Sequence, residues 1–328
     1  MTDGPRTGSH TAFLFPGQGS QAVGMGKALA DNFAAAKAVF DEVDAALNES
    51  LSRVIWEGPQ DVLTLTANAQ PALMAVSLAT LRVLETEAGL DLSRDAAFVA
   101  GHSLGEYSAL AAAGALTITE AARLLRIRGR AMQEAVPVGE GAMAALLGLD
   151  YDQAVAVAAE AAGDDVCEAA NDNAPGQVVV SGTRAAVERA ILIAKEKGAM
   201  KAVLLPVSAP FHCRLMGPAA EAMEVALSGS TVMTPRVPVV ANVRASPVTD
   251  PAEIVRLLVE QVTGTVRWRE SIIYMAGAGV NRVVEVGAGK VLCGLVKRID
   301  KSVAASAVGT PEDVAAYIAA RDAAASAA

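Results

Sequence analysis

The segment GHSLG at 101–105 restricts the fold of this 328-residue chain more than any other feature of its sequence. An apolar run at 96–100, AAFVA, precedes it and is typical of a buried parallel strand. A helical run, EYSALAAA, follows and ends at a glycine. A turn that joins a strand to a helix this tightly has no room for side chains at its shoulders, which accounts for Gly101 and Gly105. The segment therefore predicts an elbow with Ser103 at its tip.

Strands and helices alternate through most of the chain. Helical stretches of ten or more residues separate the predicted strands, which lie at 11–15, 96–100, 237–241, 282–286 and 303–308. This alternation predicts a parallel sheet covered by helices on both faces, which is an α/β fold.

The middle of the chain follows another order. Between Gly141 and Pro206 we expect strand, helix, strand, strand, helix and strand, at 142–149, 151–162, 166–170, 177–181, 183–197 and 202–205. The order βαββαβ is that of the ferredoxin-like unit. We therefore predict a small ferredoxin-like subdomain at 138–206, inserted into a larger subdomain formed by 1–137 and 207–328.

Composition limits the classes of function. A formal net charge of −9 argues against a general nucleic-acid binder. No stretch approaches the roughly 18 to 20 apolar residues of a membrane span, and the start, MTDGPRTGSH, has no apolar signal segment, so we expect a cytoplasmic protein without a membrane partner. The three cysteines are widely spaced and support neither a disulfide framework nor a zinc site, and we expect no metal and no cofactor.

A nucleophilic serine needs a base, and histidine is the usual one. The chain has three: His10 in a start without predicted structure, His102 beside the serine, where successive side chains diverge, and His212. The last lies in VSAPFH at 207–212, where the inserted segment rejoins the main sheet and a cleft is expected. A lone histidine in a loop is more often ordinary surface, but the elbow and the elimination of the other two favour His212 as the base.

An arginine is predicted to point into the protein. TITE at 117–120 has the spacing of a capping box and starts a helix that runs to about residue 135. Arg128 lies in its apolar stripe, whereas we expect Arg123, Arg126 and Arg130 to point elsewhere, into solvent. An inward guanidinium needs an anion. A buried Asp or Glu of the protein and a carboxylate on a substrate are both possible from the spacing alone.

Two glycine-rich loops partly match nucleotide-binding motifs. PGQGS at 16–20 could present backbone amides to a phosphate or to a developing oxyanion, but Ala22 replaces the third glycine of the dinucleotide fingerprint. VGAGK at 286–290 lacks the Ser or Thr that follows the lysine of a P-loop. Neither loop predicts a nucleotide site.

Seven segments, in order along nearly the whole chain, resemble the malonyl-CoA:acyl carrier protein transacylases and the related acyltransferase domains of polyketide synthases. They are FPGQGSQ at 15–21, GHSLGEY at 101–107, RG with MQEAVP at 128–137, NAPGQVVVSG at 173–182, VSAPFH at 207–212, EQVTGTVRW at 260–268 and VGAGKVLCGLVKRI at 286–299. Any one could arise by chance, but seven in register make the resemblance specific. The family fold that it implies is an α/β-hydrolase-like core, which would be the catalytic subdomain, with a ferredoxin-like insert.

The resemblance implies a role for each candidate residue. Ser103 would be the acylated nucleophile and His212 its base, oriented by the main-chain carbonyl of Gln261 instead of by an aspartate. Arg128 would bind the malonyl carboxylate.

Further roles are implied around these residues. The backbone N–H groups of Gln18 and Leu104 would form the oxyanion hole. Phe211 and Leu104 would favour malonyl over methylmalonyl groups. An insertion of Asp172 in a variable loop leaves open whether Asn171 or Asn173 contacts the substrate.

The activity implied by the resemblance is a ping-pong transfer from malonyl-CoA, through a malonyl-serine ester, to the phosphopantetheine thiol of acyl carrier protein. The expected carrier belongs to fatty-acid synthesis, with polyketide synthesis as the alternative, and the enzyme is expected to be a monomer. Because such carriers are acidic, docking needs a basic area. Its candidates are Lys290, Lys297, Arg298, Arg267 and Arg269.

Two other classes of function share some of these features. A serine esterase or thioesterase of the α/β-hydrolase type has the same elbow. Such enzymes usually carry their histidine close to the C-terminus, whereas 116 residues follow His212 here. A non-catalytic docking module would have no use for Ser103, His212 and Arg128 together.

Overall fold

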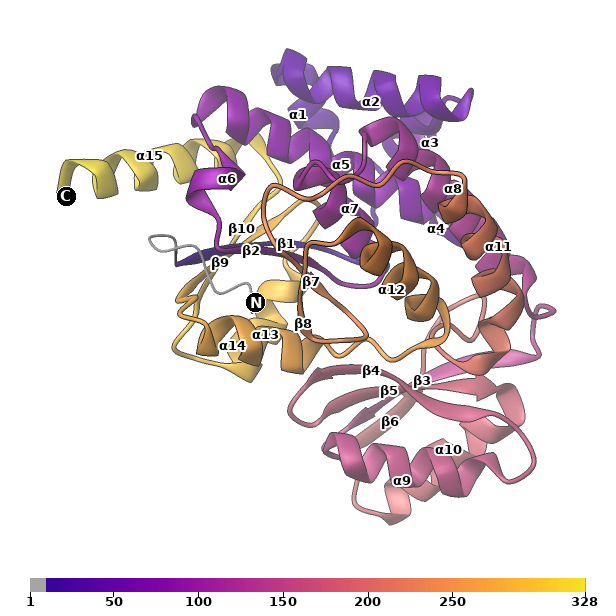
Figure 1. Ribbon diagram of the computed structural model, residues 1–328. Coiled ribbons are helices and arrows are strands. Elements are labelled where there is room, and N and C mark those ends of the chain that lie inside the picture. Colours follow the sequence, from indigo (N-terminus) through magenta and orange to yellow (C-terminus); the bar gives the residue numbers. More distant parts are fainter. Residues whose placement is uncertain (1–9, 328) are drawn as a thin grey trace.

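The computed structural model describes residues 10–327, and two separate sheets organise them (Figure 1). The larger sheet has six strands in the order β10-β9-β1-β2-β7-β8. In chain order they are β1 (Thr11–Phe15), β2 (Phe98–Gly101), β7 (Val239–Ala241), β8 (Ser246–Val248), β9 (Arg282–Val286) and β10 (Ala304–Val308). All neighbours pair in parallel except β8, which pairs antiparallel with β7 at the edge. The predicted parallel sheet is thus confirmed as a largely parallel one, and β8 was not predicted.

Helices cover both faces of this sheet because its strands are apolar on both sides. On β1, Phe13 and Phe15 belong to the larger core, whereas Ala12 and Leu14 belong to a second core on the opposite face. The helices of the larger core are α1 (Lys27–Asn32), α2 (Ala34–Leu47), α3 (Leu51–Glu57), α4 (Gln60–Thr64), α5 (Thr66–Glu87), α6 (Leu92–Asp95), α7 (Gly105–Ala112), α8 (Ile118–Glu134), α11 (Gly217–Ser228), α12 (Pro251–Thr263) and α15 (Pro311–Ala327). Those of the second core are α13 (Trp268–Gly277) and α14 (Val291–Ile299).

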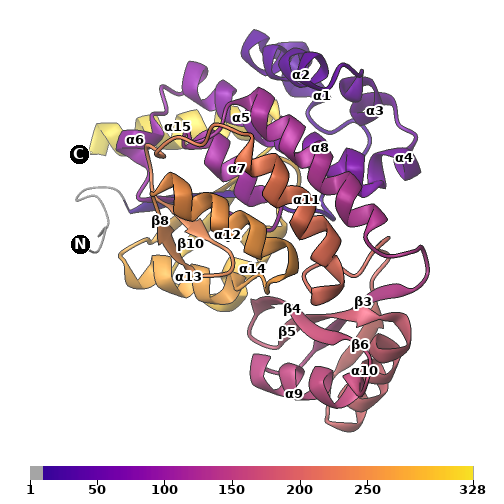
Figure 2. The ribbon, with the colours of Figure 1, turned by 45° about the vertical axis from the view of Figure 1, so that its right-hand side comes forward.

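The inserted segment forms the smaller sheet, which lies beside the large one (Figure 2). Its elements are β3 (Gly141–Leu147), α9 (Tyr151–Ala162), β4 (Cys167–Ala174), β5 (Gln177–Thr183), α10 (Arg184–Glu196) and β6 (Lys201–Leu204). The strands pair antiparallel throughout, in the order β4-β5-β3-β6, and α9 and α10 cover one face. A hydrophobic cluster of its own joins these helices to the sheet. The predicted order βαββαβ is present.

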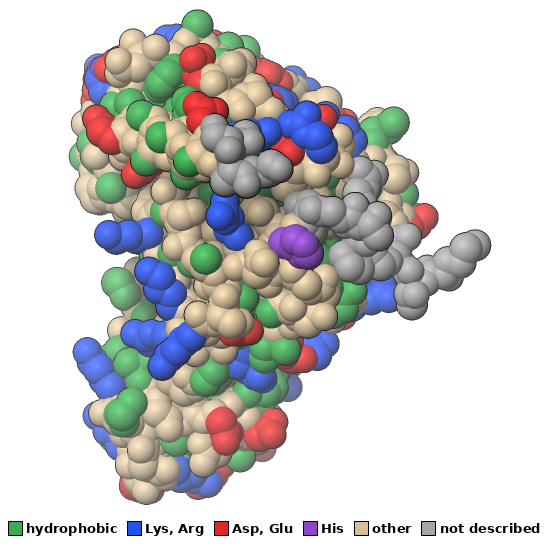
Figure 3. Space-filling view, turned by 90° about the vertical axis from the view of Figure 1, so that its left-hand side faces the viewer, with side chains coloured by type: hydrophobic (Ala, Val, Ile, Leu, Met, Phe, Trp, Pro, Cys, Tyr) green, Lys and Arg blue, Asp and Glu red, His purple; other side chains and the backbone are tan. Residues whose placement is uncertain are grey.

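The surface is not uniformly acidic despite the net charge of −9. On the side where α14 and α15 lie, Lys and Arg side chains gather along one edge, toward the inserted segment (Figure 3). The chain therefore carries the local basic area that its overall charge does not suggest.

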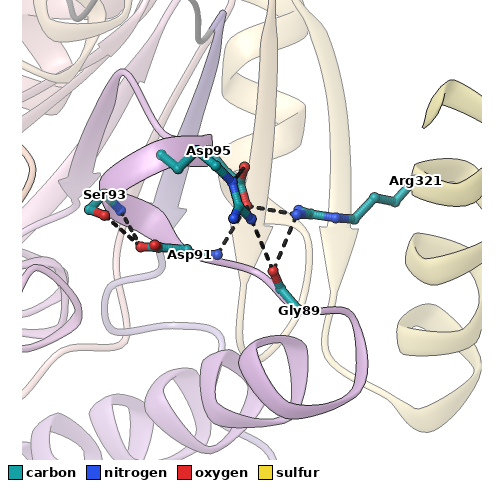
Figure 4. Close-up of polar contacts among 6 residues, drawn as sticks. Gly89, Asp91, Ser93, Asp95 and Arg321 are labelled. Atoms are coloured by element: carbon teal, nitrogen blue, oxygen red, sulfur yellow. Dashed lines mark hydrogen bonds and ion pairs between the residues drawn. The ribbon is translucent and has the colours of Figure 1, made fainter. Parts of the chain in front are cut away.

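An ion-pair cluster ties the last helix, α15, to the short helix α6 (Figure 4). Arg321 Nη2 lies 2.8 Å from Asp95 Oδ2, and Arg94 Nε lies 2.9 Å from Asp95 Oδ1. Both arginines also donate to the carbonyl oxygen of Gly89, at 3.2 Å each. Burial raises the pKa of Asp95, but hydrogen bonds from Arg94, from the Asp91 N–H and from Arg321 outweigh it and lower the pKa to about 2.

This cluster predicts an acid-dependent loss of stability. Because the pKa of Asp95 is depressed, its carboxylate stabilises the fold fully above the ordinary value of 3.8 and loses that contribution as the pH falls toward 2. Asp95→Asn should lower the free energy of unfolding by about 1 kcal/mol at pH 7 and by roughly half as much at pH 3. Urea unfolding at several pH values measures the loss at each pH. The control is Asp31→Asn, because Asp31 is an exposed carboxylate that pairs with Lys27. An equal loss at pH 7 and pH 3 would contradict the assignment.

Candidate active site

The elbow predicted at 101–105 connects the end of β2 to the start of α7. Ser103 has φ of 54°, in the left-handed region, at the turn itself. A Cβ on Gly101 would lie 1.8 Å from the Gly105 carbonyl oxygen, and a Cβ on Gly105 would lie 2.2 Å from the Phe15 carbonyl oxygen. Only glycine fits at either shoulder, because backbone meets backbone there without intervening side chains.

Ser103 and His212 are in direct contact, although 109 residues separate them. Ser103 Oγ lies 2.8 Å from His212 Nε2, and His212 Nδ1 lies 2.9 Å from the main-chain oxygen of Gln261 in α12. A carbonyl oxygen can only accept, so Nδ1 carries the proton and Nε2 is free to accept the proton of the serine. The histidine is therefore fixed in the tautomer that a base requires.

The surroundings of His212 keep it uncharged. Its side chain is buried, and burial lowers the pKa to about 3, with a further contribution from the positive charge of Arg128. His212 also lines a cavity of about 370 Å³ between the inserted segment and the residues that follow α12. The imidazole is thus a neutral base at neutral pH, at the boundary of the two units of the fold.

Arg128 reaches the same serine from α8. Its guanidinium is 1% exposed, and Nη2 lies 3.2 Å from Ser103 Oγ. Nη1 donates to Gln70 Oε1 and Nη2 to Gln261 Oε1, at 2.8 Å each, and the ring of Tyr107 lies 5.8 Å from the guanidinium carbon. These partners are neutral.

The guanidinium of Arg128 has no carboxylate within 4 Å among residues 10–327, so the buried salt bridge that the sequence left possible is not found there. Its Nε is buried without a hydrogen-bond partner in the same part of the chain. Burial lowers the pKa of Arg128 from 12.5, yet an arginine in this state stays charged. Nε–H is therefore the donor of this buried cation that residues 10–327 leave without a partner, and Nη2 is shared between Gln261 Oε1 and Ser103 Oγ.

Arg126 corrects one expectation about the same helix. It is not solvated: only 6% of it is exposed, and its Nη2 pairs with Glu49 Oε2 at 2.8 Å. Its Nη1 donates to the main-chain oxygen of Ala67. Arg123 and Arg130 are exposed, as expected.

The loop after β1 lies against the elbow. A Cβ on Gly17 would lie 2.7 Å from the main-chain oxygen of His102, so this loop and the elbow pack backbone to backbone. The N–H groups of Gln18 and Leu104 have no acceptor among the residues that the structure describes. Two backbone donors that the chain does not satisfy, one on each side of this contact, are suited to an oxyanion.

Two residues of the site escaped the sequence analysis. Asn242, just after β7, accepts from Ser103 N–H at 2.7 Å and donates to the Gly101 oxygen at 2.7 Å. Glu106, in α7, accepts from Asn242 N–H at 3.0 Å. The available signal was position: Asn242 follows a strand that ends at the same edge of the sheet as β2.

The remaining predicted residues lie around this centre. Phe211 is 8% exposed and belongs to the larger core beside His212. Residues 171–173 correct an expectation, because they lie in β4 and not in a loop. Asn173 Oδ1 lies 2.8 Å from His102 Nε2, and Asn171 forms a bridge with Val266. His102 therefore contacts Asn173 instead of the Ser103–His212 pair.

Residues 10–327 contain no group of three or more His, Cys, Asp or Glu side chains placed to hold a metal ion. No helix in that range is long and apolar enough to cross a membrane.

Comparisons with known proteins show the family of the chain. The profile of the acyl transferase domain family matches residues 12–319. The chain is 48% identical over 307 residues to the malonyl CoA-acyl carrier protein transacylase of Bacillus subtilis, covering 93% of this chain and 95% of that protein. It is 46% identical over 307 residues to the protein of the same name from Escherichia coli K12, covering 94% and 98%.

Solved structures give the same result. The crystal structure of the acyl-carrier-protein-S-malonyltransferase from Bartonella henselae superimposes with a TM-score of 0.93 at 57% identity, covering 95% of this chain and 99% of that one. A malonyl-transacylase in complex with a type II polyketide synthase acyl-carrier protein gives a TM-score of 0.91 at 40% identity, covering 95% and 99%. The chain belongs to the acyl transferase domain family and, within it, to the malonyl CoA-acyl carrier protein transacylases.

Proposed function

We propose that the chain transfers the malonyl group of malonyl-CoA to the phosphopantetheine thiol of acyl carrier protein, for fatty-acid synthesis, through an ester on Ser103. One observation carries the choice of acyl group. The buried guanidinium of Arg128 lies 3.2 Å from the serine oxygen that His212 also contacts. A cation this close to the nucleophile selects an acyl group that ends in a carboxylate a few bonds from its carbonyl.

In the first half-reaction, Ser103 Oγ attacks the thioester carbonyl of malonyl-CoA while His212 Nε2 takes the hydroxyl proton. The oxyanion that forms is held by the backbone N–H groups of Gln18 and Leu104. The carbon–sulfur bond then breaks, and the proton passes from Nε2 to the departing CoA sulfur. The main-chain oxygen of Gln261 stabilises the transient imidazolium through Nδ1–H.

The second half-reaction runs the same steps with another thiol. The phosphopantetheine sulfur attacks the ester of Ser103 while His212 accepts the thiol proton, which it returns to the serine oxygen as the ester bond breaks. Arg128 holds the malonyl carboxylate during both steps. Burial of the histidine and arginine side chains beside the partly exposed serine limits the access of water to the ester between the two steps.

The esterase or thioesterase alternative explains less of this arrangement. A hydrolase of a neutral ester has no use for a buried arginine with neutral partners beside its nucleophile. The histidine is also oriented by a main-chain carbonyl and not by an acid. The alternative of a polyketide carrier stays open, because one similar transacylase was solved with such a carrier.

We also infer the finer description of the fold. The six-stranded sheet and its helices form an α/β-hydrolase-like core made of 1–137 and 207–328, and 138–206 forms a ferredoxin-like subdomain. The strand order β4-β5-β3-β6 and the separate hydrophobic cluster of the insert support these boundaries. A cytoplasmic location and a monomeric state stay predictions from the sequence.

The carrier protein is proposed to dock on basic residues at α14. Lys290, Lys297 and Arg298 are exposed, and α14 lies on the side of the molecule that Figure 3 shows, where basic side chains gather. Lys290 lies closest to the site, because a Cβ on the neighbouring Gly289 would contact Ser20 in the loop of Gln18.

The other two docking candidates are weaker. Arg267 pairs with Glu270, and Arg269 pairs with Asp172 at 2.7 Å. Paired cations of this kind offer less attraction to an acidic carrier than unpaired ones.

The central prediction is a covalent intermediate. Brief mixing with malonyl-CoA, followed by intact-protein mass spectrometry, should show a malonyl adduct that is absent from Ser103→Ala. Addition of carrier protein should remove the adduct and produce malonyl-carrier. Accumulation of free malonate without an adduct would favour the hydrolase instead.

A second prediction concerns Arg128. Arg128→Ala should lower kcat/KM for malonyl-CoA by about 2 to 4 kcal/mol, roughly 30- to 1000-fold, because the substrate carboxylate loses its buried partner. Acetyl loading should fall much less or rise. Arg130→Ala, an exposed arginine of the same helix, is the control and should change neither. Equal losses for malonyl and acetyl, together with a lower melting temperature, would make the arginine structural.

A third prediction follows from the lowered pKa of His212, which is about 3. A base with that pKa is still neutral at pH 5, so kcat/KM for malonyl loading should not fall between pH 7 and pH 5. A histidine with the ordinary pKa of about 6.5 would lose roughly 30-fold over the same range. Stopped-flow measurements of malonyl loading across this pH range, at low and at saturating malonyl-CoA, distinguish the lowered pKa of His212 from the ordinary one.

A further inference from the structure

A second buried ionisable group, Glu106, takes no part in the steps above. It lies in α7, three residues beyond Ser103, and is 2% exposed. Its Oε2 accepts from the N–H of Asn242 at 3.0 Å and from Nε2 of Gln261 at 2.8 Å. Keeping a carboxyl charged at this depth costs free energy. Its protonation state therefore depends on its hydrogen-bond partners and on nearby charges.

The side chain of Gln261 joins Glu106 to Arg128. Its Nε2 donates to Glu106, and its Oε1 accepts from Arg128 Nη2, at 2.8 Å each. Gln261 is itself fully buried. One amide therefore bridges an anion and a cation that do not touch. Glu106 is thus the internal counter-charge of a guanidinium whose direct partners are neutral.

The charge on Glu106 responds to its neighbours near neutral pH. Burial raises the pKa of Glu106 to about 7, against the hydrogen bonds from Asn242 and Gln261 and the positive charge of Arg128. The charged or titratable groups that face it are Arg128 from α8 and Tyr107 from its own helix. Any new negative charge at Arg128 will favour the protonated form of Glu106 further.

We propose that Glu106 is a specificity-determining residue, the counter-charge that Arg128 exchanges for the malonyl carboxylate, so that malonyl loading is accompanied by uptake of a proton at Glu106. The proposal rests on the proposed function in one respect, that Arg128 receives this carboxylate. Before loading, the buried pair of Arg128 and ionised Glu106 is neutral. After loading, protonation of Glu106 keeps the site neutral, because two carboxylates would otherwise share one guanidinium.

The same exchange discriminates between acyl groups. An acetyl group brings no carboxylate, so Glu106 keeps its charge and no proton is taken up. By linkage, malonyl loading should weaken as the pH rises and Glu106 ionises, whereas acetyl loading should not. Arg128 supplies the attraction, and Glu106 makes that attraction depend on a proton.

Proton uptake during loading tests the proposal directly. The transfer itself is proton-neutral at pH 7, because the serine proton leaves on the CoA thiol, which stays protonated at that pH. A pH indicator in weakly buffered solution should therefore report uptake of a fraction of one proton for each malonyl group loaded, counted by mass spectrometry, and none for each acetyl group. Adduct formation without proton uptake would overturn the proposal and leave the proposed function intact. Absence of any adduct would instead contradict the proposed function.

A variant pair identifies the proton acceptor. Glu106→Gln keeps the size of the side chain and an acceptor oxygen but has no charge to titrate. It should abolish the uptake and remove the decrease in malonyl kcat/KM between pH 6 and pH 8.5. Glu285→Gln is the matched control, because Glu285 is also fully buried and accepts from Leu292 N–H and Cys293 N–H at the start of α14.

The control should lower the melting temperature without changing the uptake or the pH dependence. Persistent uptake in folded Glu106→Gln would assign the proton to another group and overturn the proposal. If that variant does not fold, the wild-type comparison of malonyl with acetyl still decides.

Discussion

The close approach of three backbone segments, with no side chains between them, is the constraint on which the site depends. Gly101 and Gly105 let the end of β2, the start of α7 and the end of β1 meet. That contact forces Ser103 into a left-handed conformation, which costs free energy for a residue with a side chain. Asn242 and Gln261 compensate by bonding the Ser103 N–H and carbonyl oxygen. Ser103, the proposed nucleophile, is therefore held by its main chain, and its hydroxyl contacts only His212 and Arg128 among the described residues.

The electrostatics of the site follow from burial combined with neutral partners. The amides of Gln70 and Gln261 bind Nη1 and Nη2 of Arg128 without neutralising it, so the positive charge keeps its attraction for an anionic ligand. The same charge, with burial, keeps His212 unprotonated. In the proposed mechanism, selection of the acyl group and activation of the serine both depend on Arg128, and Gln261 contributes to both through its side chain and its carbonyl oxygen.

The sequence predicted the parts of this structure that depend on residue type and local period, and missed those that depend on strand order. Ser103 could be predicted because glycines lie on both sides of it. His212 could be predicted because the chain has only two other histidines. Asn242 could not be predicted as a site residue from the sequence. It contacts Ser103 only as a result of the pairing of β7 with β2. Strand β8 has three residues, including Pro247, and gives no periodic signal. Residues 171–173 looked like a loop because irregular pairing of β4 with β5 interrupts the apolar alternation.

The reacting groups and the residues that line the cavity beside His212 come largely from different units of the fold, which has an evolutionary consequence. The groups proposed to do chemistry, Ser103, His212, Arg128 and the carbonyl of Gln261, all belong to elements outside 138–206. The insert lines part of the cavity beside His212. It also contributes Asn173, whose side chain contacts His102. Substitutions in the insert can therefore reshape the cavity beside His212 without replacing any of these groups. Descendants of one such enzyme could diversify in what they accept while their chemistry stayed fixed.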